Sequence, residues 1–223
     1  MQSGRLMRLH LDAFYSFLAK PLKPRARVLL AVLALPLALS FTQPLWRISM
    51  EAPQYPNGLT MDIYSYKVEG GNDGQHIQEI NTLNHYIGMH TLDREAMGDL
   101  DWIPFALGAL FIFALRVAAI GNVSALIDLV VMTAYVSAFA FSRFVYTLYS
   151  FGHHLRPDAP VKIPGFMPAV LGSKQIANFT THSWPQGGSY FLGAFALGTV
   201  GVLVWHLVSG RRAALKDARL VAA

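Results

Sequence analysis

The stretch that decides the fold is IPFALGALFIFALRVAAI at residues 103–120, in which Arg116 is the only charged residue. A helix of about 20 apolar residues crosses the hydrocarbon core of a bilayer, so this stretch predicts a transmembrane helix. A second apolar stretch follows at residues 125–149, after only the short segment GNVS. The spacing predicts two membrane spans joined by a tight turn.

Two further stretches, residues 28–46 and 190–209, are also long and apolar enough to span a membrane. With 53% hydrophobic and 14% charged residues, the chain is too apolar for an ordinary soluble protein. No clear cleavage site follows the first span, which indicates a retained anchor. The predicted fold class is therefore membrane all-α, with four transmembrane helices and two long connections. We call residues 47–102 the first connection and residues 150–189 the second connection.

Positive charges indicate how these spans are oriented. Six Lys and Arg residues precede the first span, four follow the last, and one lies near the tight turn, whereas the two much longer connections carry six between them. Cytoplasmic segments are enriched in Lys and Arg. We therefore predict an inner-membrane protein with both termini in the cytoplasm and both connections outside it. Because the basic residues adjoin apolar spans, their excess predicts contact with membrane lipid and gives no reason to expect nucleic acid.

The two ends of the chain are predicted to be cytoplasmic segments, residues 1–27 and 210–223. Within the first, residues 6–18 place most apolar side chains along one side of a helix, a pattern typical of a helix on the inner leaflet. A disordered basic tail is the alternative. Small residues at steps of four, such as Ala134 and Ala138, predict close packing between spans.

The first connection carries both strand and helix signals. Residues 59–68, LTMDIYSYKV, alternate loosely and are rich in β-branched and aromatic residues, which is compatible with a short β-hairpin. A glycine-rich turn follows at residues 70–74. Residues 76–90 then place isoleucine and leucine at steps of three and four, which predicts an amphipathic helix.

On that helix His85 and Met89 lie four residues apart and are predicted to share a face. Imidazole and thioether together suit copper, especially Cu(I), and the chain contains no cysteine. A capping histidine and a gap-filling methionine would produce the same pattern. Four other histidines of the connections are candidates to complete a metal site: His90, His153, His154 and His182. For the second connection, a proline-rich structural cover is the alternative interpretation.

Other chemistries find little support in the sequence. It contains no nucleophile elbow, no phosphate-binding glycine loop and no dinucleotide fingerprint, so an enzymatic role is not favoured. His206 lies in the fourth span, but no other span offers a histidine at matching depth, so no haem is expected. Copper is the one candidate cofactor.

Three segments resemble those of a known group of proteins: MEAPQYPNGL at 50–59, INTLNHYIGM at 80–89 and KQIANF at 174–179. They are similar to small multi-span membrane proteins whose genes accompany the nitrous oxide reductase assembly machinery. That reductase is an exported multicopper enzyme, and its helper proteins handle copper, sulfur or electrons. The resemblance implies a role in one of these processes and assigns no catalytic residue.

The leading hypothesis is a non-enzymatic accessory protein that binds or relays copper at its outer face and supports maturation of an exported copper enzyme. A second hypothesis is an anchoring or scaffold subunit, because nine of the thirteen acidic residues fall in the first connection and could dock an exported partner. A third is a quinol or electron-transfer subunit, supported by Arg143 beside Phe144, Tyr146 and Tyr149. The alternative interpretation is that Arg143 snorkels or forms a structural pair and that the aromatic residues belong to an ordinary interfacial belt.

The predicted orientation is tested with reporters that are active only outside the cytoplasm. Fusions at residue 75 and at residue 165 should both be active, and a fusion after the C-terminal tail should be inactive, because Lys and Arg retain their segments in the cytoplasm. Cytoplasmic activity at either internal position would show that the orientation is wrong.

Overall fold

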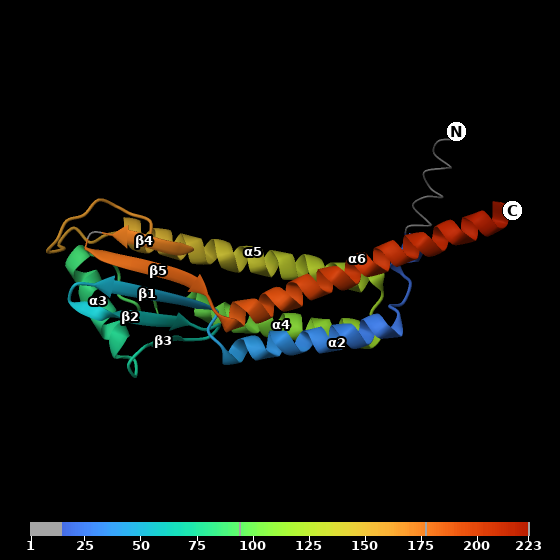
Figure 1. The fold of residues 1–223 in the computed structure, drawn as a ribbon, viewed down its shortest axis with the longest axis horizontal. Coiled ribbons are helices and arrows are strands. Elements are labelled where there is room, and N and C mark those ends of the chain that lie inside the picture. The colour runs from blue at the N-terminus through green and yellow to red at the C-terminus, as the bar shows by residue number, and fades with distance from the viewer. Residues whose placement is uncertain (1–14, 94, 177, 223) are drawn as a thin grey trace, which may run out of the picture. The chain divides into compact units, whose positions relative to one another are not determined.

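The computed structural model describes residues 15–93, 95–176 and 178–222 (Figure 1). Its elements, in chain order, are α2 (Pro24–Leu39), the 3-10 helix η1 (Ser40–Thr42), β1 (Trp46–Ala52), β2 (Tyr55–Ile63), β3 (Val68–Gly70), α3 (Gln75–Ile87), α4 (Asp99–Ile120), α5 (Val123–His153), β4 (Gly172–Ile176), β5 (Phe179–Pro185) and α6 (Gly187–Ala222). Most of the helix predicted at residues 6–18 lies outside the described residues.

Four helices in the described part of the chain are long and apolar enough to cross a membrane. They are Pro24–Thr42, Asp99–Ile120, Val123–His153 and Gly187–Arg212. Each combines the length that a bilayer requires with a strongly apolar composition. The chain is therefore a multi-pass membrane protein, as predicted.

The helices differ from the predicted spans at their ends. The first span was predicted to reach residue 46, but α2 ends at Leu39 and Trp46 already belongs to β1. Phe41, Leu45 and Trp46 raise the hydropathy of the segment after Leu39, and hydropathy alone does not distinguish entry into a sheet from a span. The other three helices begin before their predicted spans, and α5 and α6 also extend beyond them, because a helix can continue into polar sequence.

A five-stranded antiparallel sheet, in the order β3-β2-β1-β5-β4, contradicts the all-α prediction. The first connection supplies β1, β2 and β3, and the second supplies β4 and β5. The predicted short hairpin corresponds only to β2 and β3, joined by a turn after Ile63. The sheet was missed because its central ladder, β1 with β5, pairs segments that lie far apart in the sequence.

The face of the sheet beneath α3 forms an apolar core. Alternate residues of a strand point to the same face, so Leu59 and Met61 of β2 lie together. Met50 lies opposite Leu59 on β1. These three side chains pack with Ile80 of α3, and all four are nearly inaccessible to solvent. The amphipathic helix predicted in the first connection is thus present, with its apolar side against the sheet.

The turn before α3 follows from its residue types. Asn72, Asp73 and Gly74 have backbone φ angles of 52°, 54° and 90°, in the left-handed region that Asn, Asp and Gly tolerate best. Directly afterwards, Nδ1 of His76 accepts a hydrogen bond from the backbone N–H of Thr60 at 3.0 Å. This bond ties the start of α3 to β2.

The chain divides into two compact units. The described part of the helical unit comprises residues 15–37, 108–135 and 193–222, and the described part of the sheet unit comprises residues 38–93, 95–107, 136–176 and 178–192. Helices α4, α5 and α6 contribute residues to both units.

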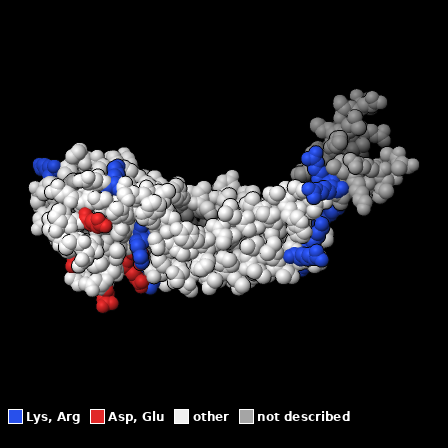
Figure 2. Space-filling view, viewed as in Figure 1, with Lys and Arg blue, Asp and Glu red and all other residues white. Residues whose placement is uncertain are grey.

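In the helical unit, the segment before α2 lies against the tight turn between α4 and α5. The backbone N–H of Leu22 donates to the carbonyl oxygen of Gly121, and that of Val123 donates to the carbonyl oxygen of Lys20. Nε2 of His206 in α6 accepts a bond from the N–H of Lys23 at 3.3 Å. Basic residues of this unit gather at one end of the face in Figure 2. The segment before α2, the turn between α4 and α5, and the last part of α6 therefore lie at the same end of the helical unit.

Small residues allow close helix packing in this unit at Gly198, whereas the predicted pair Ala134 and Ala138 is exposed on α5. Gly198 of α6 faces Leu33 of α2 so closely that an added Cβ would lie 2.3 Å from the leucine Cδ2 atom. Contact at such short range is what drives helix association in lipid.

Replacing Gly152 by alanine should destabilise the protein. The second connection crosses α5 at this residue, and an added Cβ would lie 1.9 Å from the carbonyl oxygen of Phe166. Overpacking costs about 1–3 kcal/mol, which lowers Tm by about 2–4 °C per kcal/mol in a protein of this size. Thermal unfolding in detergent measures the change. Gly98→Ala is the control because its Cβ would meet open space, and an equal Tm for the two variants would contradict the described packing.

Candidate functional site

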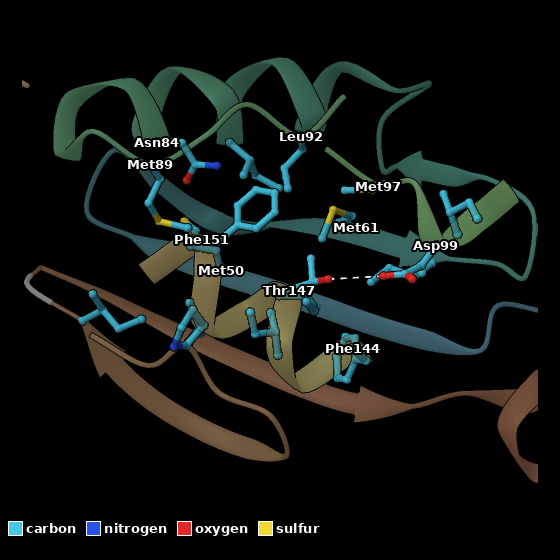
Figure 3. Close-up of a pocket in the computed structure, with 18 of the residues that line it drawn as sticks. Met50, Met61, Asn84, Met89, Leu92, Met97, Asp99, Phe144, Thr147 and Phe151 are labelled. Carbon is cyan, nitrogen blue, oxygen red and sulfur yellow. Dashed lines mark hydrogen bonds between the residues drawn. The ribbon is translucent and has the colours of Figure 1, made fainter. Parts of the chain in front are cut away.

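The sheet unit contains a pocket of about 170 Å³ (Figure 3). One side is formed by the sheet, which contributes Ile48, Met50, Met61 and Ile63. The other sides come from α3, the first residues of α4, the last part of α5 and the second connection. Among the described lining residues, the polar side chains are Asn84, Asp99, Thr147 and Thr181. The surface of the pocket is therefore almost entirely apolar.

Four methionines line this pocket, which is half of the eight methionines in the chain. Met50 and Met61 come from neighbouring strands, Met89 follows α3, and Met97 precedes α4. Figure 3 shows Met50 and Met89 at the end of the pocket that also holds Asn84. Half of the thioethers of the chain therefore belong to the lining of one pocket.

The end of α3 places Met89 in this pocket. Gly88 has a φ of +79°, and the N–H groups of Gly88 and Met89 donate to the carbonyl oxygens of His85 and Asn84. This is the left-handed glycine cap that commonly ends helices. The prediction that His85 and Met89 share a helix face is therefore wrong, because the helix ends at Ile87. The glycine after an amphipathic stretch was a signal for that ending.

Two asparagines of α3 hold the segment that follows it. Asn81 accepts a hydrogen bond from the N–H of Leu92 at 2.7 Å. One turn later, the side-chain amide of Asn84 donates to the carbonyl oxygen of His90 at 3.3 Å. The chain therefore turns back along its own helix, and Met89 and Leu92 reach the pocket.

The two connections contact each other at the end of α3. The N–H of Arg156 donates to the carbonyl oxygen of Gly88 at 2.8 Å, and the N–H of Val161 donates to that of Tyr86 at 2.9 Å. Nη2 of Arg156 lies 2.7 Å from Nδ1 of His85. A guanidinium can only donate, so His85 uses its one acceptor nitrogen on Arg156 when neutral. That leaves His85 no lone pair for a metal.

The two histidines at the end of α5 bond within their own helix. Nδ1 of His153 donates to the carbonyl oxygen of Tyr149 at 3.0 Å, and the two rings stack with centroids 3.9 Å apart. Nδ1 of His154 lies 2.9 Å from the hydroxyl oxygen of Ser150. Both imidazoles are exposed.

The remaining candidate histidines lie in separate surroundings. His90 is exposed and meets the ring of Phe151 edge to face, at a centroid distance of 6.1 Å. His182 lies on β5, where Nδ1 is 2.6 Å from the hydroxyl oxygen of Ser173 and Nε2 is 3.8 Å from Glu51. Among the described residues, no three His, Cys, Asp or Glu side chains gather closely enough to hold a metal ion. Of the predicted ligands, Met89 lies in the pocket.

Asp99, which lies at the opposite end of the pocket from Met89 in Figure 3, forms an ion pair with Arg143. Nε of Arg143 donates to Oδ1 of Asp99 at 2.9 Å, and the indole N–H of Trp102 donates to the same oxygen at 2.9 Å. The hydroxyl of Thr147 reaches Oδ2 only at 3.4 Å. The guanidinium of Arg143 also lies over Tyr146, 5.4 Å from the ring centroid. Arg143 of α5 therefore forms a structural ion pair with Asp99 of α4.

Several acidic groups of the first connection also have internal partners. Arg47 forms a two-bond contact with Asp62 at 2.6 Å, and Lys67 pairs with Glu69. The hydrogen bond to Glu69 raises the pKa of Lys67. Both signs of charge are visible on the sheet unit in Figure 2. The predicted acidic lobe is therefore partly neutralised.

The segment that carries Met97 is held by local hydrogen bonds to a carboxylate. Asp93 accepts from the N–H of Ala96 at 2.8 Å and from the hydroxyl of Thr91 at 2.7 Å. These bonds lower the pKa of Asp93, the backbone bond most strongly. These bonds hold the turn that lies between the pocket residues Leu92 and Met97.

Sequence reasoning missed most of the pocket residues. Phe144, Thr147 and Phe151 follow helical spacing along α5, but aromatic residues near a membrane interface suggest an ordinary belt. That Met50 and Met61 line the pocket could be predicted only with knowledge of the strand pairing. The alternation of Leu59, Met61 and Ile63 in β2 was the available signal for a shared face.

No protein-family model matches the chain, and a search of curated proteins found no significant match. The three segments that carry the resemblance nevertheless meet at this pocket. Met50 comes from the first segment, Asn84 and Met89 from the second, and Ile176 and Phe179 from the third.

Replacing Gly88 by alanine should lower the stability of the sheet unit. The left-handed conformation costs a non-glycine residue about 1–2 kcal/mol, and the new Cβ would also lie 2.9 Å from the Cβ of Ala159. Gly74→Ala is a matched control, because Gly74 has a φ of +90° and open space around it. Thermal unfolding should show a larger fall in Tm for Gly88→Ala. Equal falls would mean that the contact with the second connection contributes nothing.

Proposed function

We propose that this protein is a membrane accessory protein that binds Cu(I) outside the cytoplasm, at the methionine-lined end of its pocket, and supplies it to an exported copper enzyme. The observation that carries the proposal is that Met50 and Met89 lie together at one end of a pocket that Met61 and Met97 also line (Figure 3). The likeness of residues 50–59 and 80–89 to proteins of nitrous oxide reductase assembly motivates the proposed recipient.

The donor chemistry selects the ion. Thioethers are soft, neutral ligands that suit Cu(I), whereas Zn²⁺ and Cu²⁺ prefer imidazole, carboxylate or water. The chain has no cysteine, so thioethers are its only soft donors. An apolar surrounding also favours an ion of single charge, because the cost of burying a charge grows with its magnitude. The pocket is therefore better suited to Cu(I) than to a divalent ion.

The ligand set differs from the one predicted from sequence. Met89 is retained, and Met50 replaces His85 as its partner. His85 gives its acceptor nitrogen to Arg156 at 2.7 Å, whereas Met50 and Met89 both line the pocket near Asn84 (Figure 3). The exposed His90, His153 and His154 lie outside the pocket lining. Of these, His153 keeps Nε2 as an acceptor, because its Nδ1 donates to Tyr149.

Titration of the purified full-length protein against a Cu(I) chelator tests this proposal. Wild-type protein should compete for Cu(I), and Met50→Leu with Met89→Leu should bind at least about tenfold more weakly, a loss of about 1.4 kcal/mol. Leucine conserves the volume of methionine, so the fold is preserved. Met132→Leu is the control, because Met132 is exposed on α5 in the helical unit. It should bind as wild type does.

The same variants are then placed in the host. Copper content of exported copper enzymes should fall in the double variant and remain normal in the Met132→Leu strain. Wild-type protein that takes up no Cu(I), or a double variant that binds Cu(I) normally, would end the proposal. If His85→Ala lost Cu(I) binding and the methionine variants kept it, the copper ligands would be histidines and not these methionines.

A further inference from the structure

We infer that the Asp99 end of the pocket binds one hydroxyl-bearing aromatic ring from a lipid-soluble molecule, of the kind found in the headgroup of a benzoquinol. This inference concerns a different end of the pocket from the proposed copper site and does not depend on copper binding. Its support comes from the size of the pocket, its polar end and its position on two membrane-spanning helices.

The size of the pocket matches a single ring. Apolar cavities of about 150 Å³ in other proteins stay dry and bind benzene, and this pocket measures about 170 Å³. Two aromatic side chains of α5, Phe144 and Phe151, are part of its surface. Aromatic rings pack favourably against one another in offset or edge-to-face arrangements. A flat apolar ring is therefore a better occupant than a sugar, a nucleotide or an ion pair.

The polar end of the pocket offers an acceptor. Oδ1 of Asp99 already accepts from Arg143 and Trp102, each at 2.9 Å. Oδ2 has the long contact of 3.4 Å with Thr147, although an ionised carboxylate oxygen can accept two hydrogen bonds. Figure 3 shows Asp99 and Thr147 joined at this end of the pocket. A ligand that brings an O–H group would make the stronger bond that Oδ2 lacks.

The charge of Asp99 selects between two forms of the same ring. The guanidinium of Arg143 stabilises the carboxylate, as does the position of Asp99 at the N-terminus of α4. A carboxylate can only accept hydrogen bonds. The hydroxyl of a quinol can donate to it, whereas the carbonyl oxygen of the corresponding quinone would face it with like partial charge. The reduced ring should therefore bind more tightly than the oxidised ring.

Two of the helices that line the pocket are suited to lipid. Ile103 of α4 and Ala140 and Phe144 of α5 line it, and both helices are apolar enough to cross a membrane. A ring carried on an alkyl tail concentrates in the bilayer because burial of each CH₂ group is favourable by about 0.8 kcal/mol. On this inference, the tail stays in lipid beside α4 and α5 while the ring occupies the pocket.

Binding of decyl-1,4-benzoquinol and decyl-1,4-benzoquinone to the full-length protein tests the inference. Both titrations are done anaerobically in detergent, with tryptophan fluorescence as readout because Trp102 bonds directly to Asp99. Wild-type protein should bind the quinol at least tenfold more tightly than the quinone. Thr147→Val should keep this preference, and Asp99→Asn should remove it, because an amide can also donate to a carbonyl oxygen.

Two further variants keep the test decisive if Asp99→Asn does not fold. Ala140→Leu should fill the pocket and abolish binding of both compounds. Met132→Leu, which lies outside the pocket lining, should bind the quinol as wild type does. The quinol titrations contain no copper and the Cu(I) titrations contain no quinol, so that each proposal can fail alone. Absence of quinol binding by wild type, equal affinity for the two forms, or normal binding by Ala140→Leu would overturn the inference.

Discussion

Strands β1 and β5 pair along their length, from Trp46 opposite Pro185 to Glu51 opposite Thr180, and the sheet unit depends on this ladder. Each strand comes from a different connection, so neither connection could form the sheet alone. A buried backbone group without a hydrogen-bond partner is costly, and the ladder satisfies these groups in the centre of the sheet. The pocket follows from it, because Met50 and Thr181 lie opposite each other on these strands and both belong to its lining.

The sequence was sufficient for those parts of the fold that depend on local pattern. Four apolar stretches identified the spanning helices, and the spacing of Ile77, Ile80 and Ile87 identified the helix of the first connection. The sheet could not be identified in this way. Its decisive pairing joins distant segments, and the short strand β4 has little pattern of its own. Phe41, Leu45 and Trp46 also suggested a longer span, since a strand and a lipid-crossing helix can both carry such side chains.

The candidate site was less predictable than the fold. His85 and Met89 lie four residues apart, yet a single left-handed glycine between them sends one side chain to the surface and the other into the pocket. The spacing of residues in the sequence therefore predicted the wrong neighbour for Met89. The association of Met89 with Met50 and Met97 depends on tertiary structure, as does the pairing of Asp99 with Arg143, which are separated by most of α4 and α5.

The concentration of thioethers in an apolar pocket has a consequence for redox chemistry. Oxidation converts methionine into a sulfoxide, which is polar, chiral and bulkier, and sulfoxide reductases can reverse the change. At Met50 or Met61, both nearly inaccessible to solvent, the added oxygen would have apolar neighbours and few donors for a hydrogen bond. Because the folded sheet shields these two thioethers from oxidants, the lesion would form mainly when the sheet unit opens, and it would then hinder the unit from closing again around its pocket.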